Sequence, residues 1–144
     1  MASQSPDGAV LPQRRGAVAV ILRGERFLVI RRAATVPAPG KYCFPGGGIE
    51  GPETEAEALV RELREELGVE IQPTRRLWRS VTHWRVELAW WHGEIAIDAT
   101  LVPNAAEVES IHWLTAAEML ELDDLLESNR QFLQAIASGE IVLT

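Results

Sequence analysis

The sequence predicts a single domain of the α/β class, and three observations lead to that prediction. The chain has 144 residues, of which 47% are apolar and 24% are charged, which is typical of a globular protein with one buried core. Short apolar runs that favour strands stand on both sides of a strongly periodic segment that favours a helix. No internal repeat or linker divides the sequence into two parts.

The N-terminal part of the sequence predicts a flexible tail followed by a β-hairpin. Residues 1–14 mix Ser, Pro, Gly and Gln without periodicity, so they are expected to be flexible, and the domain is expected to cover 15–144. Two apolar runs at 16–22 and 27–31 are separated by a short polar segment. Such a pair of runs with a short connection is typical of a hairpin.

A helix is predicted over Glu55–Leu67, after a long loop. Residues 33–53 are rich in proline and glycine, which opposes regular structure and favours a loop of the kind that carries function. Thr54 and Glu57 have the spacing of a capping box, and Gly68 is placed to end the helix. The predicted apolar stripe of this helix consists of Ala56, Leu59, Val60, Leu63 and Leu67.

Three carboxylates, Glu62, Glu65 and Glu66, share the helix sector next to that stripe. Like charges at this spacing repel by ~0.2–0.5 kcal/mol per pair, so something should compensate for them. The commonest explanation of a charge run is a solvated helix face. However, the glycine-rich segment Pro45–Gly48 can bring backbone carbonyl oxygens beside the helix, and Mg²⁺ and Mn²⁺ prefer carboxylate, carbonyl and water oxygens. Together the two features favour a metal–phosphate site. Glu55, in contrast, is expected to be exposed and replaceable.

The remaining sequence predicts further strands and then two helices. Apolar and aromatic runs predict strands at 75–81, 83–91 and 94–102. Thr115 is placed to cap a helix over 116–126, and a last helix is predicted over 129–138.

Composition and charge exclude several classes of protein. No apolar run approaches the roughly 20 residues of a membrane-spanning helix, and the start lacks the apolar core of a signal peptide, so a cytoplasmic protein is expected. The net charge of −7 argues against a nucleic-acid-binding surface. Cys43 has no partner for a disulfide and is expected to be a small buried side chain. The three histidines, His83, His92 and His112, lack metal-ligand spacing and are expected on the surface or in packing roles. Most of the five tryptophans are expected to be core or packing residues.

The segment from Gly47 to Val69 resembles the Nudix box. Gly47 is followed after five residues by Glu53, and after seven more by the run RELREELGV at Arg61–Val69, which fills every fixed position of the motif. The preceding Phe44-Pro45-Gly46 and the predicted hairpin also resemble the family. The resemblance implies an α/β/α sandwich with a mixed β-sheet. It also implies a hydrolase that uses Mg²⁺ or Mn²⁺ to split a diphosphate linkage in a nucleoside diphosphate joined to another group.

The same resemblance implies roles for individual residues. Glu62, Glu65, Glu66 and the backbone carbonyl of Gly46 would bind metal, with Glu62 or a carboxylate outside the box assisting deprotonation of water. Arg61 would pair with Glu53 and orient the cluster, and Gly68 would end the helix in a left-handed conformation. A further carboxylate is expected ahead of a tryptophan-containing strand, where Glu107 is preferred to Glu109.

The resemblance also bears on the substrate. Asn129 takes the position where MutT-type enzymes read a purine, although an asparagine at the start of a helix is more often its N-cap. The patterns of coenzyme A, ADP-ribose and dinucleotide polyphosphate hydrolases are missing, which leaves a nucleoside triphosphate with an ordinary or oxidised base. The protein is expected to act as a monomer or homodimer on this small molecule, without a nucleic-acid or membrane partner. The alternative is a domain that binds a nucleotide or nucleotide sugar as a sensor and does no chemistry.

Overall fold

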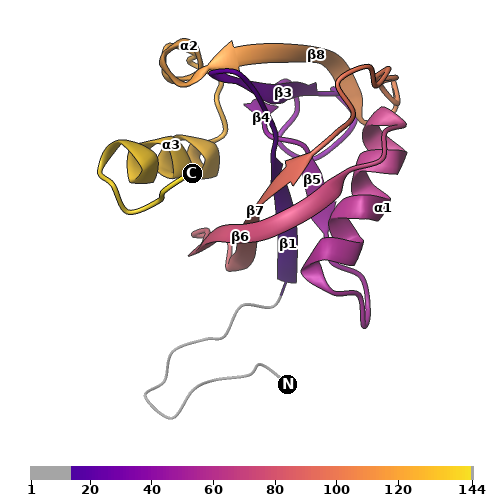
Figure 1. The fold of residues 1–144 in the computed structure, drawn as a ribbon, viewed down its shortest axis with the longest axis horizontal. Helices are drawn as coiled ribbons and strands as arrows, with labels where there is room; N and C mark the ends of the chain where they lie inside the picture. Colours follow the sequence, from indigo (N-terminus) through magenta and orange to yellow (C-terminus); the bar gives the residue numbers. More distant parts are fainter. Residues whose placement is uncertain (1–13, 144) are drawn as a thin grey trace.

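A computed structural model of the chain describes residues 14–143. The predicted tail therefore lies outside the described residues, except for Arg14, which begins the first strand. Figure 1 shows the elements in chain order. They are β1 (Arg14–Val20), β2 (Leu22–Arg23), β3 (Arg26–Arg32), β4 (Tyr42–Cys43), β5 (Gly46–Gly48), α1 (Glu55–Leu67), β6 (Gln72–Val81), β7 (Val86–Glu94), β8 (Val108–Thr115), α2 (Ala116–Leu120) and α3 (Glu127–Ala137).

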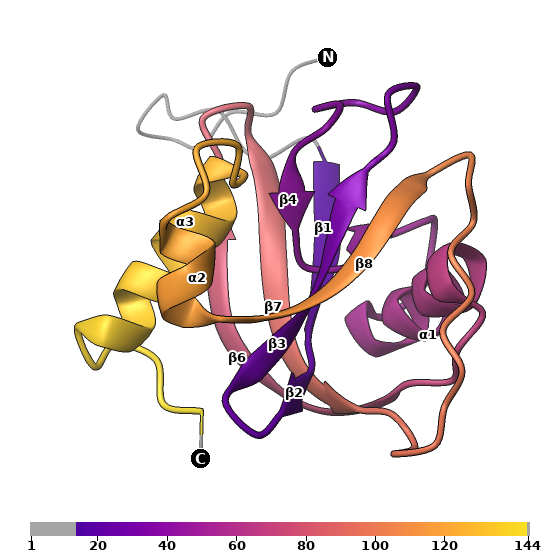
Figure 2. The ribbon, with the colours of Figure 1, turned by 90° about the horizontal axis from the view of Figure 1, so that it is seen from above.

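The strands form two sheets that lie between helices. One sheet has the order β5-β1-β7-β6 and is mixed, because β1 and β7 are parallel while the other pairs are antiparallel. In the other sheet β3 pairs antiparallel with β2, β4 and β8. Figures 1 and 2 show α1 on one side of the strands and α2 with α3 on the other. The predicted α/β class and the mixed sheet are confirmed. The second, antiparallel sheet was not predicted.

The predicted hairpin at 16–22 and 27–31 is much shorter than expected. Only Leu22–Arg23 pairs with the start of β3, while β1 leaves to lie between β5 and β7. The reason is the burial of both faces of β1, since Ala17 and Ala19 belong to one core and Val20 to the other. A strand buried on both faces belongs in the middle of a sheet.

Helix α1 has the predicted boundaries and caps. The Thr54 hydroxyl accepts a hydrogen bond from the Glu57 amide at 3.1 Å, and the Glu57 carboxylate accepts one from the Thr54 amide at 2.9 Å. Gly68 follows the helix with φ 60°, and its amide donates to the Arg64 carbonyl. The apolar stripe differs in one place, because Ala58 is fully buried and Ala56 is only partly buried.

Two apolar cores lie on the two sides of the mixed sheet. The first packs beneath α1 and includes Leu59, Leu63 and Leu67. The second packs beneath α3, where the rings of Trp90 and Phe132 stack with their centroids 4.7 Å apart. Burying one such aromatic side chain contributes about 1.5–3 kcal/mol to folding. The tryptophans follow the expectation in part, because Trp90 is fully buried whereas Trp84 is 73% exposed.

The prediction of a strand at 94–102 is wrong. Strand β7 ends at Glu94, and the chain then runs irregularly to Val108. Backbone amides of this connection donate to the end of α1, with Val102 bonded to the Leu67 carbonyl at 2.8 Å and Asn104 to the Glu66 carbonyl at 2.9 Å. The last carbonyls of a helix need such partners, so the connection caps α1 and forms no ladder.

The boundaries of β7, α2 and α3 also differ from the prediction. The segment predicted at 83–91 begins only at Val86, because a turn precedes it. Helix α2 ends at Leu120 instead of residue 126, since Arg130 binds the carbonyls of Leu120 and Leu122. Helix α3 starts at Glu127, two residues earlier than predicted. None of the helices within residues 14–143 is long and apolar enough to cross a membrane.

Candidate active site

Strand β5 brings a glycine-rich segment against the carboxylates of α1. A Cβ atom at Gly46 would lie 2.2 Å from the Ala17 carbonyl oxygen, and one at Gly47 would lie 2.4 Å from the Glu62 carboxyl carbon. At Gly46 the clash is with backbone and φ is 149°, so this position requires glycine, whereas a side chain at Gly47 would displace the Glu62 carboxylate. The glycines therefore allow the backbone of β5 to fit between β1 and α1.

Glu66 is the most buried carboxyl group of the site, with 6% exposure. Its Oε1 accepts a hydrogen bond from the Gly46 amide at 2.9 Å. Burial raises the pKa of Glu66 to about 8; the Gly46 hydrogen bond opposes this rise, and the negative charges of Glu62 and Glu107 add to it. A nearby cation would stabilise the ionised form of a carboxyl group in this environment.

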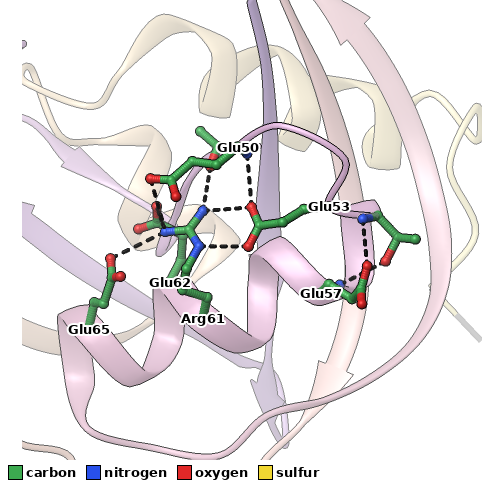
Figure 3. Close-up of polar contacts among 8 residues, drawn as sticks. Glu50, Glu53, Glu57, Arg61, Glu62 and Glu65 are labelled. Atoms are coloured by element: carbon green, nitrogen blue, oxygen red, sulfur yellow. Dashed lines mark hydrogen bonds and ion pairs between the residues drawn. The ribbon is translucent and has the colours of Figure 1, made fainter.

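Arg61 lies at the centre of the acidic cluster (Figure 3). Its guanidinium contacts Glu53 at 2.7 and 2.9 Å, Glu62 at 2.9 Å and Glu65 at 3.3 Å, and also donates to the Gly48 carbonyl at 2.8 Å. The expected pair of Arg61 with Glu53 is present. Hydrogen bonds from Arg61 and from the Glu50 backbone lower the pKa of Glu53 to about 2. Arg61 thus joins the loop before α1 to the carboxylates on the helix.

Glu62 is another carboxyl group of the acidic cluster with a raised pKa, and Glu107 adds negative charge to the cluster. Burial raises the pKa of Glu62, Arg61 opposes this rise, and the charges of Glu65 and Glu107 add to it. The charge of Glu107 thus raises the pKa of both Glu62 and Glu66. Glu109 instead points to the exposed Arg31, with 3.4 Å between the charged groups. This arrangement favours Glu107 over Glu109 as the additional carboxylate.

The oxygen atoms at this site fit a hard divalent cation by their chemistry. Carboxylates from α1 and the backbone of β5 lie together at the β5 edge of the mixed sheet, and the charge of one carboxylate from the connection before β8 acts on them. Among the described residues no three acidic, histidine or cysteine side chains already form a metal cage. Glu62 and Glu65 are turned to Arg61, and Glu66 to the Gly46 amide. The donors are thus gathered but are held by protein partners.

A cavity of about 580 Å³ opens beside the glycine-rich strand. This volume lies in the range of small-molecule sites, which is roughly 300–1,000 Å³. Strands β1, β4, β5 and β7 and the start of α3 form its walls. Its lining includes Arg32, Phe44, Gly46, Gly47 and Asn129.

Asn129 lines this cavity but is not an N-cap. It is the third residue of α3, is 3% exposed, and its Oδ1 accepts a hydrogen bond from the Phe44 amide at 2.9 Å. Its Nδ2 donates to the Ser128 hydroxyl at 3.2 Å. The N-cap interpretation is therefore wrong, because α3 begins at Glu127 and has no side-chain cap.

Arg32 is a cavity residue that the sequence interpretation missed. It ends β3, lines the cavity, and donates to the Pro37 carbonyl at 2.6 Å. Its charge also opposes the raised pKa of Glu66. The signal in the sequence was an arginine at the junction of a buried strand and the long loop.

Cys43, next to Arg32, is buried as predicted, and burial raises the pKa of its thiol to about 11.

The histidines and Glu55 lie away from this cavity. His92 contacts the Thr74 hydroxyl, His112 contacts Ser110, and His83 packs against Trp84. The expectation that Glu55 is exposed is wrong, because its side chain is only 10% exposed. Arginines and a tryptophan indole from the mixed sheet bind its carboxylate.

The sequence and the fold both match known proteins. A model of the NUDIX domain matches residues 12–136. The chain is 33% identical over 106 residues to the CTP pyrophosphohydrolase of Escherichia coli K12, which covers 72% of this chain and 76% of that protein. It is 38% identical over 88 residues to the 8-oxo-dGTP diphosphatase of the same organism, which covers 51% of this chain and 65% of that protein. The crystal structure of a MutT protein from Methanosarcina mazei Go1 has the same fold, with a TM-score of 0.76, 20% identity, and coverage of 90% of this chain and 96% of that chain.

Proposed function

This chain belongs to the Nudix hydrolase family, and we propose that it cleaves the diphosphate linkage of a nucleoside triphosphate with Mg²⁺ or Mn²⁺ as its cofactor. The observation that carries the proposal is the position of Glu62 and Glu66 against Gly46 and Gly47, two glycines that also line the cavity. A nucleotide in that cavity would have its phosphates beside the carboxylates. Such a juxtaposition is what phosphoryl chemistry requires.

The cofactor would be held by oxygen atoms of the cluster. The proposed ligands are Glu62, Glu65, Glu66, Glu107 and the Gly46 carbonyl. When bound, a divalent cation lowers the pKa of an attached water molecule and offsets negative charge on the phosphates. The raised pKa values of Glu62 and Glu66 support this assignment, because a buried group of like charges is stabilised by a cation.

The side chains of the chain itself would orient the substrate and move a proton. Glu62, largely buried and with a raised pKa, suits the acceptance of a proton from water. Arg61 and Glu53 would hold the glycine-rich loop and the helix together during the reaction. Arg32 would supply the positive charge that a phosphate in the cavity needs.

The base would be bound near Asn129. Its amide accepts from Phe44 and donates to Ser128, which leaves one hydrogen and one lone pair for a nucleobase edge. Relatives named for CTP and for 8-oxo-dGTP differ in base, so we propose only the nucleoside triphosphate class, which includes oxidised purines.

The test is hydrolysis of a panel of ordinary and oxidised nucleoside triphosphates with Mg²⁺ or Mn²⁺, with diphosphate and phosphate measured separately. The wild-type protein is expected to release diphosphate from at least one of them, and Glu65→Gln and Glu66→Gln are expected to lose about a hundredfold or more in rate. Normal Mn²⁺ binding without hydrolysis of any substrate would instead indicate a nucleotide sensor. Insensitivity of rate and of Mn²⁺ binding to both substitutions would contradict the metal site itself.

A further inference from the structure

Glu55, the first residue of α1, has an unusually large set of partners for a helix residue. Its Oε1 accepts from the Trp91 indole at 2.8 Å and lies 3.6 Å from Arg76. Its Oε2 accepts from Arg79 at 3.0 Å and from Arg15 at 3.3 Å. The side chain is 10% exposed, whereas the three arginines are about half exposed. The carboxylate is therefore the fixed centre of this cluster.

The partners of Glu55 come from three strands of the mixed sheet. Arg15 belongs to β1, Arg76 and Arg79 belong to β6, and Trp91 belongs to β7. The positive end of a helix dipole lies at its N-terminus, so guanidinium groups are unfavourable there unless a carboxylate stands between them and the helix. Glu55 occupies that intermediate position. It allows an arginine-rich sheet surface to pack against the first turn of α1.

Arg15 also connects this cluster to the glycine-rich segment. Its side chain contacts Glu55, while its backbone carbonyl accepts a hydrogen bond from the Ile49 amide at 2.9 Å. Ile49 directly follows β5. One residue of β1 thus fixes both the segment that lines the cavity and the first turn of the helix that carries the acidic cluster.

We propose that Glu55 is a positioning residue of the active site, which fixes the first turn of α1 to β1, β6 and β7 and so keeps Glu62, Glu65 and Glu66 aligned with the cavity. The inference rests on the proposed function. Shifts of about 1 Å in a reacting geometry can cost about a hundredfold in rate, so a loss of this contact should be visible in catalysis.

The test compares Glu55→Ala and the isosteric Glu55→Gln with two controls. Glu70→Ala removes an exposed ion pair with Arg64 of α1, and Glu118→Ala removes the capping box of α2 and an ion pair with Arg26 of β3. Neither control residue contacts Glu55 or its strands through a hydrogen bond or ion pair within the described residues. For each variant, kcat, KM, Mn²⁺ affinity by electron paramagnetic resonance and thermal stability are measured at a temperature where all are folded.

Glu55→Ala is expected to lower kcat about tenfold or more and to weaken Mn²⁺ binding, with a smaller change in KM, because Glu55 itself does not line the cavity and only its partner Arg15 does. Glu55→Gln should show the same change to a smaller extent, and the controls should keep wild-type kcat whatever their stability. Wild-type kcat and Mn²⁺ affinity in folded Glu55→Ala or Glu55→Gln would overturn the proposal. If the wild-type protein hydrolyses no nucleotide, Mn²⁺ affinity alone decides the role of Glu55, so the two proposals fail separately.

Discussion

At the scale of single residues, Glu66 links the stability of the protein to pH. Its pKa in the folded chain is raised from 4.5 to about 8, so this group stabilises the metal-free fold fully below about pH 4.5. That contribution is lost as the pH rises through about 8, because the buried group must then ionise.

The melting temperature of the metal-free protein is therefore expected to fall more steeply between about pH 4.5 and 8 than that of Glu66→Gln, whose amide does not titrate. Added Mg²⁺ or Mn²⁺ should restore stability increasingly as the pH rises, since the ionised carboxylate binds the cation. Calorimetry of both proteins with and without metal checks this. Parallel pH profiles for the two proteins would show that Glu66 does not titrate as its burial suggests.

Gly47 and Gly48 offer a matched pair of substitutions. A Cβ at Gly47 would meet the Glu62 carboxylate at 2.4 Å, whereas one at Gly48 would meet nothing within 4 Å. Gly47→Ala is expected to displace Glu62 and to lower kcat about tenfold or more, and Gly48→Ala should stay close to wild type. Steady-state kinetics of the two variants on the same nucleotide compare them directly. Equal losses would mean that the space at Glu62 is not the constraint.

The sequence was informative for those residues whose partners are near in the chain. The pair of Arg61 with Glu53, which the resemblance implied, spans 8 positions, and the left-handed Gly68 follows from the end of a helix. Glu55 was misread as exposed because its partners are 21 to 40 positions away and meet it only after the sheet forms. Arg32 was missed for a similar reason, since the cavity is assembled from separate strands.

At the scale of elements, two capping boxes of the same type stand on helices with different tasks. Thr54 caps α1, which carries the acidic cluster, and Thr115 caps the short α2. Thr54→Ala and Thr115→Ala are each expected to cost about 1 kcal/mol in the free energy of unfolding. Only Thr54→Ala should also weaken Mn²⁺ binding and lower kcat. Denaturant unfolding and kinetics check both parts, and an activity loss in Thr115→Ala alone would contradict this division.

The predicted boundaries were right where the determinants are local and wrong where other elements decide. Helix α1 begins and ends as predicted because its caps lie within its own sequence. The run at 94–102 has the composition of a strand, but its amides bind the carbonyl end of α1 instead. Helix α2 was predicted too long, because the sequence does not reveal that Arg130 binds the carbonyls of Leu120 and Leu122.

At the scale of the whole molecule, the core beneath α3 supports the proposed base site. The ring of Phe132 packs against Trp90 and against Phe44, whose amide binds Asn129. Phe132→Ala is expected to cost about 3–5 kcal/mol in stability, as is usual for a buried aromatic residue. It should also raise KM for the nucleotide, because Phe44 and Asn129 lose their support. Exposed Gln131→Ala is the control for both measurements, and an unchanged KM would separate this core from substrate binding.

The parallel pair of β1 and β7 has a consequence for the order in which the chain can fold. Residues 14–20 pair with residues 86–92, and the indole that binds Glu55 lies on β7 as well. The ribosome therefore completes α1 before it has synthesised β7, the strand that pairs with β1 and carries the indole. Contacts so distant along the chain close slowly. Maturation of the acidic helix must therefore wait until the chain has been synthesised as far as β7.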